Sequence, residues 1–568
     1  MSKSARPSET SKPQGNILEP VTPADGEQLL WTGLGGDSLP LAVSRLAENR
    51  DGLVVVITPD MQSAEVLQEQ VEYFTTQEAL KVTTLPDWET LPYDKFSPHP
   101  DIISERLATL YQLAGMQRGL LIVSVPTLLQ RLPPADYIYQ NSLILKTGDT
   151  LDLDGMRARL GSAGYRAVSQ VMEHGEFAVR GSLLDIYPMG NDKPYRIDLF
   201  DEEIDSIRTF DCDSQRSLDT VDSIRMLPAR EFPMHEEAIR LFRRRFRAAF
   251  AGDAQDCSVY RDVSQGNAPA GIEYYLPLFS DSTCTLFDYL PDNAVLLQLD
   301  ATDIASENFL EQLEERYEAR RHDVERPILA PAELFIDAGE LQTCLGGYRC
   351  IEIRLFKGTA SGNRVIDYHA SVPGNVRVRP RGDEPAGALQ KFIDGYTGRI
   401  LITAESAGRR ETLLDQLRGF GIRPVPVRDW HDFIASSESL CITVAPLEVG
   451  MKLVTPAVAI ITETALFGDH ARQTRRRKPA RDPASVVRNL TDLEIHAPVV
   501  HEENGVGRYL GLETIRVGDI ETEYLALEYA GGDKLYVPVA SLALVSRYTG
   551  ASPENAPLHR LGSDQWER

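Results

Sequence analysis

The sequence predicts a multidomain α/β protein, in which a parallel-sheet domain carries an inserted β-rich module and is followed by a second α/β domain and a small β-barrel. Three observations predict this fold class. The chain has 568 residues, more than the roughly 250–300 that one hydrophobic core can serve. Apolar runs alternate with helix-length segments near its start. In two other regions, apolar and polar residues alternate one by one, which is typical of antiparallel strands.

The first unit, residues 21–131, is expected to be a parallel sheet with crossover helices. The β-branched run LVVVITPD (53–60) is followed by an amphipathic stretch at 63–74, and the apolar run LLIVSVPTLLQRL follows at 120–132. Buried strands separated by helix-length segments favour this arrangement. The same pattern resumes after the next unit, so we expect residues 213–347 to complete the domain.

A β module is expected to interrupt this domain over residues 132–212. Two segments, 176–190 and 194–211, alternate apolar and polar residues around short turn sequences. A period of two with turns between the runs predicts an antiparallel meander.

The remaining boundaries follow from shifts in composition. A second α/β unit without recognisable chemistry is expected at 348–456, and a linker with a basic cluster at 457–484. Asn-Gly and Gly-Gly-Asp turns between short strands predict a small SH3-like or Tudor-like barrel at 485–549. Residues 1–20 are expected to form a disordered tail.

Charge and cysteine content exclude several classes of protein. The formal charge of −25 at pH 7 is incompatible with binding duplex DNA over the whole surface, because such binding neutralises phosphates with Lys and Arg. The 6 cysteines are scattered without a CxxC pair, so we expect no metal site. No apolar run reaches the ~20 residues of a membrane span, and the N-terminus lacks the apolar core of a secretory signal. A cytoplasmic protein is therefore expected.

The loop after the expected first strand has the glycines of a phosphate loop but lacks its other residues. In WTGLGGDSLPLAVSRLAE (31–48), Gly33 and Gly36 precede Asp37 and Ser38. A phosphate loop needs a lysine for the β- and γ-phosphates and a hydroxyl for Mg²⁺. Because an aspartate in place of the lysine would repel phosphate, we expect this nucleotide site to be inactive.

Several long stretches resemble the Mfd family of transcription-repair coupling factors. They are LPDWETLPYDKFSPHPDIISERLATLYQL (85–113), GYRAVSQVMEHGEFAVRGSLLDIYPMG (164–190), AGIEYYLPLF (270–279), HEENGVGRYLGLETI (501–515) and DKLYVPVASLALVSRY (533–548). The likeness extends from about residue 30 to the end of the chain and is weaker between 350 and 455. It implies a degenerate RecA-like domain similar to UvrB, a β module that binds UvrA, and a barrel shared with the CarD regulators that binds RNA polymerase.

Two departures from UvrB, in the light of this resemblance, argue against shared chemistry. The stretch LQLDATD keeps Asp300, but Ala301 replaces the glutamate with which a motor holds Mg²⁺ and polarises water. Pro98, His99 and Pro100 run directly into an expected helix, where UvrB has a hairpin that clamps DNA. We therefore expect no catalytic residue and no cofactor in this chain, with ATP and Mg²⁺ used only by the motor domains of the family.

The resemblance assigns Arg166, Arg180 and Tyr187 to the surface that binds UvrA. Arginine offers a planar fork for carboxylates, and both residue types are frequent at interface hot spots. Periodicity alone also allows another interpretation, in which Tyr187 is a core aromatic and the arginines are solvated strand residues.

The strand GVGRYLGL (505–512) is expected to be the exposed edge that binds the β subunit of RNA polymerase by strand addition. The expected contact residues are Val506, Gly507, Arg508, Tyr509, Leu510 and Leu512. Between residues 490 and 550 there are 10 acidic and 4 basic side chains, which disfavours nucleic-acid binding here. In the alternative interpretation, the glycines only permit a tight turn.

The basic cluster of the linker is a candidate for contact with DNA phosphates close to a bound polymerase. Its central residues are Arg475, Arg476, Arg477 and Lys478. A flexible tether is the alternative, and other contact with duplex DNA is expected of the family's motor.

The resemblance implies an adaptor for transcription-coupled nucleotide excision repair. In the family, a motor with two RecA-like lobes follows the barrel and displaces stalled polymerase, and residues 550–568 are expected to begin the linker to it. The chain is then an engineered truncation, a gene fragment or a natural short form. The competing hypotheses are a UvrB-like DNA-dependent ATPase or helicase, and a CarD-like transcription regulator.

Overall fold

The computed structural model gives the fold of most of the chain. The described residues are 15–24, 27–76, 78–354, 364–379, 384–468, 496–501, 505–517, 520–538, 545–547 and 558–560. Among the described helices, none is long and apolar enough to cross a membrane.

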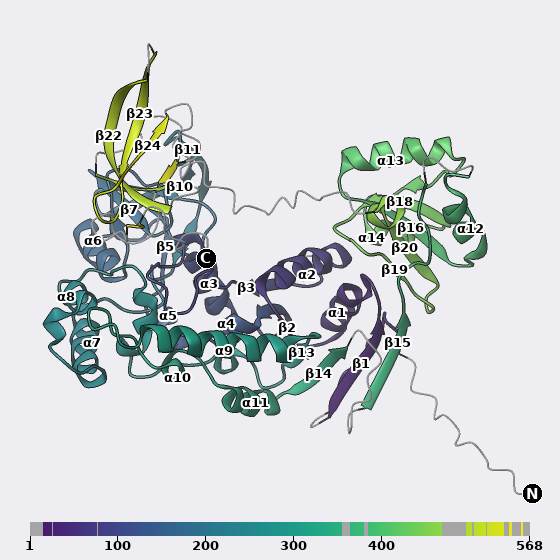
Figure 1. Cartoon of the computed structure of the whole chain (residues 1–568), viewed down its shortest axis with the longest axis horizontal. Helices are drawn as coiled ribbons and strands as arrows, with labels where there is room; N and C mark the ends of the chain where they lie inside the picture. Colours follow the sequence, from purple (N-terminus) through teal and green to yellow (C-terminus); the bar gives the residue numbers. More distant parts are fainter. Residues whose placement is uncertain are drawn as a thin grey trace, which may run out of the picture.

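The first domain contains a parallel sheet with the strand order β15-β1-β14-β13-β2-β4-β3 (Figure 1). Its strands are β1 (Gln28–Leu34), β2 (Leu53–Thr58), β3 (Val82–Leu85), β4 (Gly119–Ser124), β13 (Val295–Gln298), β14 (Arg349–Arg354) and β15 (Arg364–Ala370). Every residue of β2 is buried, as expected of a strand whose sheet is covered by helices on both faces.

Helices cover the two faces of this sheet. One face packs against α1 (Ser38–Asn49) and α2 (Met61–Phe74) through Val54 and Val56. The other face packs, through Val55 and Ile57, against a layer that includes α3 (Pro100–Leu113), α4 (Val125–Leu129), α9 (Thr302–Arg320), α10 (Pro331–Leu334) and α11 (Ala338–Gly346). Consecutive strand residues point to opposite faces, so one apolar run supplies both cores.

The inserted module is built on a six-stranded sheet with the order β11-β10-β9-β8-β7-β6. The strands are β6 (Arg166–Ala167), β7 (Glu176–Arg180), β8 (Leu183–Tyr187), β9 (Tyr195–Phe200), β10 (Glu203–Phe210) and β11 (Ser217–Val221). Neighbouring strands from β7 to β11 pair antiparallel, which confirms the predicted meander, and β11 extends the sheet beyond residue 212.

Short helices and a two-stranded sheet surround the module and connect it to the first domain. The six-stranded sheet is preceded by α5 (Ala135–Gln140), β5 (Leu143–Lys146) and α6 (Leu153–Ser162), and it is followed by β12 (Ser223–Met226), which pairs with β5. After it come α7 (Glu236–Ala249), η1 (Ala254–Asp256), α8 (Ser258–Ser264), η2 (Ile272–Leu278) and η3 (Leu286–Tyr289).

The next unit is a smaller α/β fold with the strand order β17-β18-β16-β20-β19. It comprises β16 (Arg399–Ala404), β17 (Val425–Pro426), β18 (Leu440–Val444), β19 (Met451–Lys452), β20 (Val458–Thr462), α12 (Gly387–Gly395), α13 (Ala407–Gly419), α14 (Trp430–Ala435) and α15 (Glu463–Phe467). This unit was expected to begin at residue 348, but β14 pairs with β1 and β13 in the first sheet. A buried apolar strand fits either sheet, so its pattern could not reveal which one it joins.

The last unit is a five-stranded antiparallel sheet with the order β24-β23-β22-β21-β25. Its strands are β21 (Pro498–His501), β22 (Gly505–Val517), β23 (Ile520–Glu528), β24 (Lys534–Pro538) and β25 (Val545–Arg547). His559 packs beside it, since its Nδ1 accepts a hydrogen bond of 2.7 Å from the Val506 amide, and its ring stacks on Phe96 of the first domain.

Candidate functional site

Arg166, Arg180 and Tyr187 share one face of the six-stranded sheet, here called the outer face. Glu176 of β7 pairs with Arg166 of β6 on one side and with Tyr187 of β8 on the other. Residues paired across neighbouring strands lie on the same face, as do residues four apart in one strand. Arg180, four residues after Glu176, therefore joins the same surface.

Asp185 anchors two arginines on the outer face. Its carboxylate accepts a hydrogen bond of 2.6 Å from Nη2 of Arg180 and bonds of 2.7 and 2.9 Å from Arg196. The Asp185 side chain is 1% exposed, whereas that of Arg180 is 49% exposed. Because Asp185 bonds only one nitrogen of Arg180, Arg180 keeps N–H groups with which to bind a partner.

Glu176 holds the other arginine and the loop before β7. Its Oε1 accepts a hydrogen bond of 2.5 Å from Nη2 of Arg166, and its Oε2 accepts from the amides of Met172 and Glu173 at 2.8 and 2.9 Å. The Arg166 side chain is 43% exposed. Its head group is thus oriented by a buried carboxylate and remains accessible.

Tyr187 is half-buried against a histidine. The ring centroids of His174 and Tyr187 are 4.0 Å apart, and the Tyr187 hydroxyl donates to the Asp192 carbonyl oxygen at 3.2 Å. Tyr187 is thus neither a core aromatic nor a freely solvated side chain. Part of the Tyr187 ring is exposed to solvent, and the contacts with His174 and Asp192 hold the side chain in place.

His174 connects the module to the first domain. Its Nδ1 lies 2.6 Å from Oδ1 of Asp101, in the first turn of α3, and its Nε2 lies 2.7 Å from the Asn191 carbonyl oxygen. Burial opposes ionisation of the ring, but the hydrogen bond and the charge of Asp101 raise the His174 pKa overall. Because both ring nitrogens are bonded within the chain, His174 links α3 to the loop before β9.

Sequence reasoning missed Asp185, Arg196 and Glu176, which orient the exposed side chains. Asp185 interrupts the otherwise apolar LLDIY of β8, and an acidic residue within a half-buried strand signals a buried partner. That partner is Arg196, which is adjacent to Asp185 across the β8–β9 pair. Sequence alone does not reveal this register.

The loop after β1 is filled by another part of the chain. Gly33 and Gly36 have φ angles of 70° and 66°, a left-handed backbone that glycine adopts without strain. A side chain at Gly36 would collide with the carbonyl oxygen of Gly450. The loop thus packs directly against the segment before β19.

Asp37 fixes this contact. Its backbone amide donates to the Gly450 carbonyl oxygen at 3.1 Å, and its Oδ2 accepts from the amides of Val449 and Gly450 at 3.0 and 2.7 Å. Burial raises the pKa of the Asp37 carboxyl to about 6, although the two backbone hydrogen bonds oppose this change. The side chain that stands in place of a phosphate-binding lysine therefore binds a neighbouring domain.

The other residues of the degenerate site also have partners within the chain. Ser38 is buried, and its hydroxyl donates to the Gly35 carbonyl oxygen at 3.0 Å. Ala301 adopts a left-handed φ of 67° at the start of α9, and its amide donates to Oδ1 of Asp300 at 3.1 Å. In the described part of the chain, no group of three or more His, Cys, Asp or Glu residues could hold a metal ion.

Strand β22 was expected to be a sheet edge, but its first part, Gly505 to Arg508, is paired with β21. Its first residues pair with β21 and its later residues with β23, because the chain folds back on both sides of it. Val506 and Tyr509 are buried, and Gly507 lies against the Tyr529 ring. Leu512 is 43% exposed, and Arg508 and Leu510 are partly exposed. The cluster Arg475, Arg476, Arg477 and Lys478 lies outside the described residues.

Three protein-family models match the chain. The UvrB interaction domain matches residues 143–232, which include the whole six-stranded sheet. The MFD D3 domain matches residues 392–466, and the CarD-like/TRCF RID domain matches residues 493–549.

Curated relatives match along nearly the whole chain. A transcription-repair-coupling factor of Haemophilus influenzae is 43% identical over 552 residues, which cover 97% of this chain and 48% of the relative. Proteins of the same name from Escherichia coli and Bacillus subtilis are 44% and 26% identical, over 96% and 95% of this chain and 47% of each relative. The chain thus spans about half the length of the curated relatives it matches.

Proposed function

We propose, on the premise that this chain belongs to the family of transcription-repair-coupling factors, that it is an adaptor between repair and transcription proteins. The outer face binds UvrA, and the last sheet binds RNA polymerase. The whole protein couples this recruitment to ATP-dependent displacement of polymerase stalled at DNA lesions, in transcription-coupled nucleotide excision repair.

The geometry of the outer face carries the UvrA proposal. Arg166 and Arg180 project half-exposed guanidinium groups from neighbouring strands, and each is held by a buried carboxylate. Side chains that are oriented before binding lose less entropy when a partner arrives. Because arginine pairs with carboxylates through two parallel hydrogen bonds, the complementary surface of UvrA should be acidic.

Binding to purified UvrA tests this proposal. Arg180→Ala and Arg166→Ala should each weaken binding by the ~1–4 kcal/mol that is typical of interface hot spots. Arg418→Ala is the matched control, because Arg418 is similarly exposed and ion-paired but lies on α13. Unchanged affinity in both module variants would contradict the proposed surface.

We propose that polymerase binds along the flank of β22 that begins at Leu510, within a small barrel of the SH3 or Tudor type. Among the described residues, β21 pairs with β22 only as far as Arg508, so this flank has backbone groups to offer an added strand. Arg508, Leu510 and Leu512 would contact the partner, while Val506, Gly507 and Tyr509 support the sheet. Leu512→Asp should weaken binding to the polymerase β subunit and leave UvrA binding unchanged.

The loop after β1 is proposed to bind no nucleotide. Asp37 already uses the backbone around Gly450, and a phosphate at this loop would meet the Asp37 carboxyl instead of a lysine. Calorimetry with ATP and Mg²⁺ should detect no binding by the chain. Micromolar affinity would instead favour a UvrB-like ATPase.

A further inference from the structure

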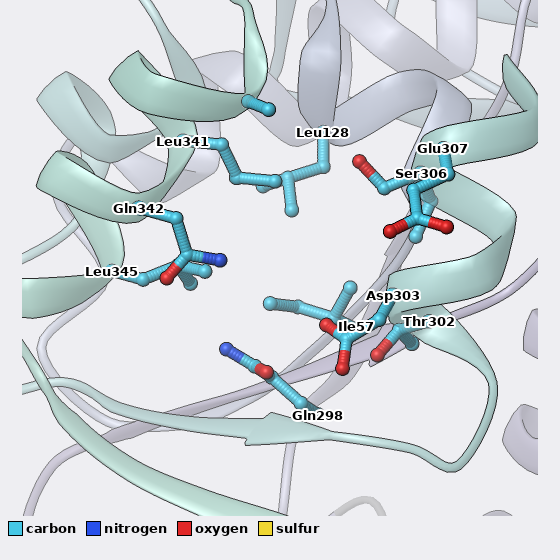
Figure 2. A pocket seen from close by; sticks show the side chains of 12 residues that line it. Ile57, Leu128, Gln298, Thr302, Asp303, Ser306, Glu307, Leu341, Gln342 and Leu345 are labelled. Atoms are coloured by element: carbon cyan, nitrogen blue, oxygen red, sulfur yellow. The ribbon is translucent and has the colours of Figure 1, made fainter. Parts of the chain in front are cut away.

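A pocket opens at the carboxyl ends of β2 and β13, between α9 and α11 (Figure 2). It has a volume of about 300 Å³. None of its lining residues belongs to the outer face, to the loop after β1 or to the last sheet. The functions proposed above therefore leave this pocket unexplained.

The pocket combines an apolar floor with a polar rim. Ile57, Leu128 and Leu341 are buried side chains of the lining. Asp303 and Glu307 project from α9 on one side, while Gln298 and Gln342 approach from β13 and α11 (Figure 2). Asp303 and Glu307 are four residues apart in a helix, so their carboxylates lie on the same face.

The rim has a charge that the described residues do not neutralise. The carboxylates of Asp303 and Glu307, both exposed residues, form no hydrogen bond or ion pair with a described residue, and the lining contains no basic side chain. Arg354 is close enough to interact electrostatically with Asp303, but its guanidinium is paired with Glu352. Two carboxylates above an apolar floor favour a ligand with a cationic head and a hydrocarbon stem.

We propose that this pocket binds an arginine side chain presented by a partner polypeptide. The methylene groups of arginine would cover the floor of Ile57 and Leu341, because long charged side chains bury their stems on apolar surface. The guanidinium has five N–H donors in a planar fork. It could therefore reach the carboxylates of α9 and the amide oxygen of Gln342 together, which the compact ammonium of lysine does less well.

The test uses the whole chain, with isoleucine and leucine methyl groups labelled for NMR. The probe is N-acetyl-leucyl-arginine amide, and the matched probe replaces arginine with citrulline, which has nearly the same shape and no charge. The arginine probe should cause saturable shifts at Ile57, Leu128 and Leu341. Asp303→Asn combined with Glu307→Gln should weaken its binding about tenfold, whereas the control Glu311→Gln on the same helix should not.

Three outcomes would overturn the proposal. Equal binding of the citrulline probe would show an apolar pocket without charge recognition. Tighter binding of spermidine than of the arginine probe would point to a free polyamine as the ligand. An absence of methyl shifts in a chain whose spectrum is otherwise that of the folded protein would show that the pocket does not bind arginine. UvrA and polymerase binding, measured on the same variants, should be unchanged, so failure here is distinct from failure of the adaptor function.

Discussion

The loop after β1 and the outer face of the β module use charged side chains in opposite ways. At the loop, Asp37 points inward, and its carboxylate accepts hydrogen bonds from the backbone of a neighbouring domain. On the outer face, the buried carboxylate of Asp185 lies beneath Arg180, whose head group remains half exposed.

The difference shows why the loop after β1 does not present its charge to a ligand, whereas the outer face presents an oriented charge to a partner. A carboxylate that is buried and bonded to the backbone of the same chain is not presented to a ligand. An exposed cation that is anchored by a buried counter-charge keeps its orientation and most of its donors.

Restoring the missing lysine should not restore a nucleotide site. Asp37→Lys combined with Ser38→Thr would bury an ammonium group beside the backbone of Gly450. We expect this to lower the free energy of unfolding by about 3–5 kcal/mol. Urea unfolding measures this loss, and calorimetry should still detect no ATP. If the variant kept full stability and bound ATP, the loop would be a nucleotide site that lacks only its cation.

Asp37 should also make stability depend on pH. Burial raises its pKa from 3.8 to about 6 in the folded state, so the folded chain binds this proton more tightly than the unfolded chain does. The stabilisation is complete below pH 3.8 and is lost as pH rises through about 6, a change on the order of 3 kcal/mol.

The pH prediction is tested by comparing unfolding free energies of the native chain and Asp37→Asn between pH 4 and 8. As pH rises, the free energy of unfolding of the native chain should fall relative to that of Asp37→Asn. Other titrating groups are common to both proteins, so their contributions cancel in the comparison. A constant difference would mean that the carboxyl has an ordinary pKa.

On the outer face, Asp185→Asn should reduce both stability and binding. It removes the negative charge that faces Arg180 and Arg196 and leaves donors without acceptors, at a cost of about 1–3 kcal/mol. UvrA affinity should fall as well, because Arg180 loses its orientation. Asp205→Asn is the control, since Asp205 is an exposed residue of β10 in the same sheet and is not among the hydrogen-bond partners of Arg180 and Arg196. Normal UvrA binding by Asp185→Asn would show that the anchor is not needed.

The smallest stability effect is expected for Arg180→Ala itself. The Arg180 side chain is 49% exposed, and exposed ion pairs contribute at most about 1 kcal/mol to folding. Its effect on UvrA binding should exceed its effect on urea unfolding, which separates a binding residue from a structural one. A loss of stability as large as the loss of binding would argue against this distinction.

Local patterns determined much of the fold. The continuous apolar run of β2 predicted a strand covered on both faces, and the period of two between residues 176 and 211 predicted the meander. They did not assign β14 to the first sheet, because sheet membership is decided by contacts between distant segments. For the same reason they did not show that β21 pairs with the first residues of β22, up to Arg508.

The candidate sites divide in the same way. That the loop after β1 lacks a lysine is evident from the residues alone, since a missing cation needs no geometry to be recognised. It also provided, through family resemblance, the positions Arg166, Arg180 and Tyr187. The folded structure was needed to show that Asp37 binds the backbone at Gly450 and that Asp185 holds Arg180 and Arg196. Such hydrogen bonds depend on strand register and domain packing, which bring together residues that are far apart in the chain.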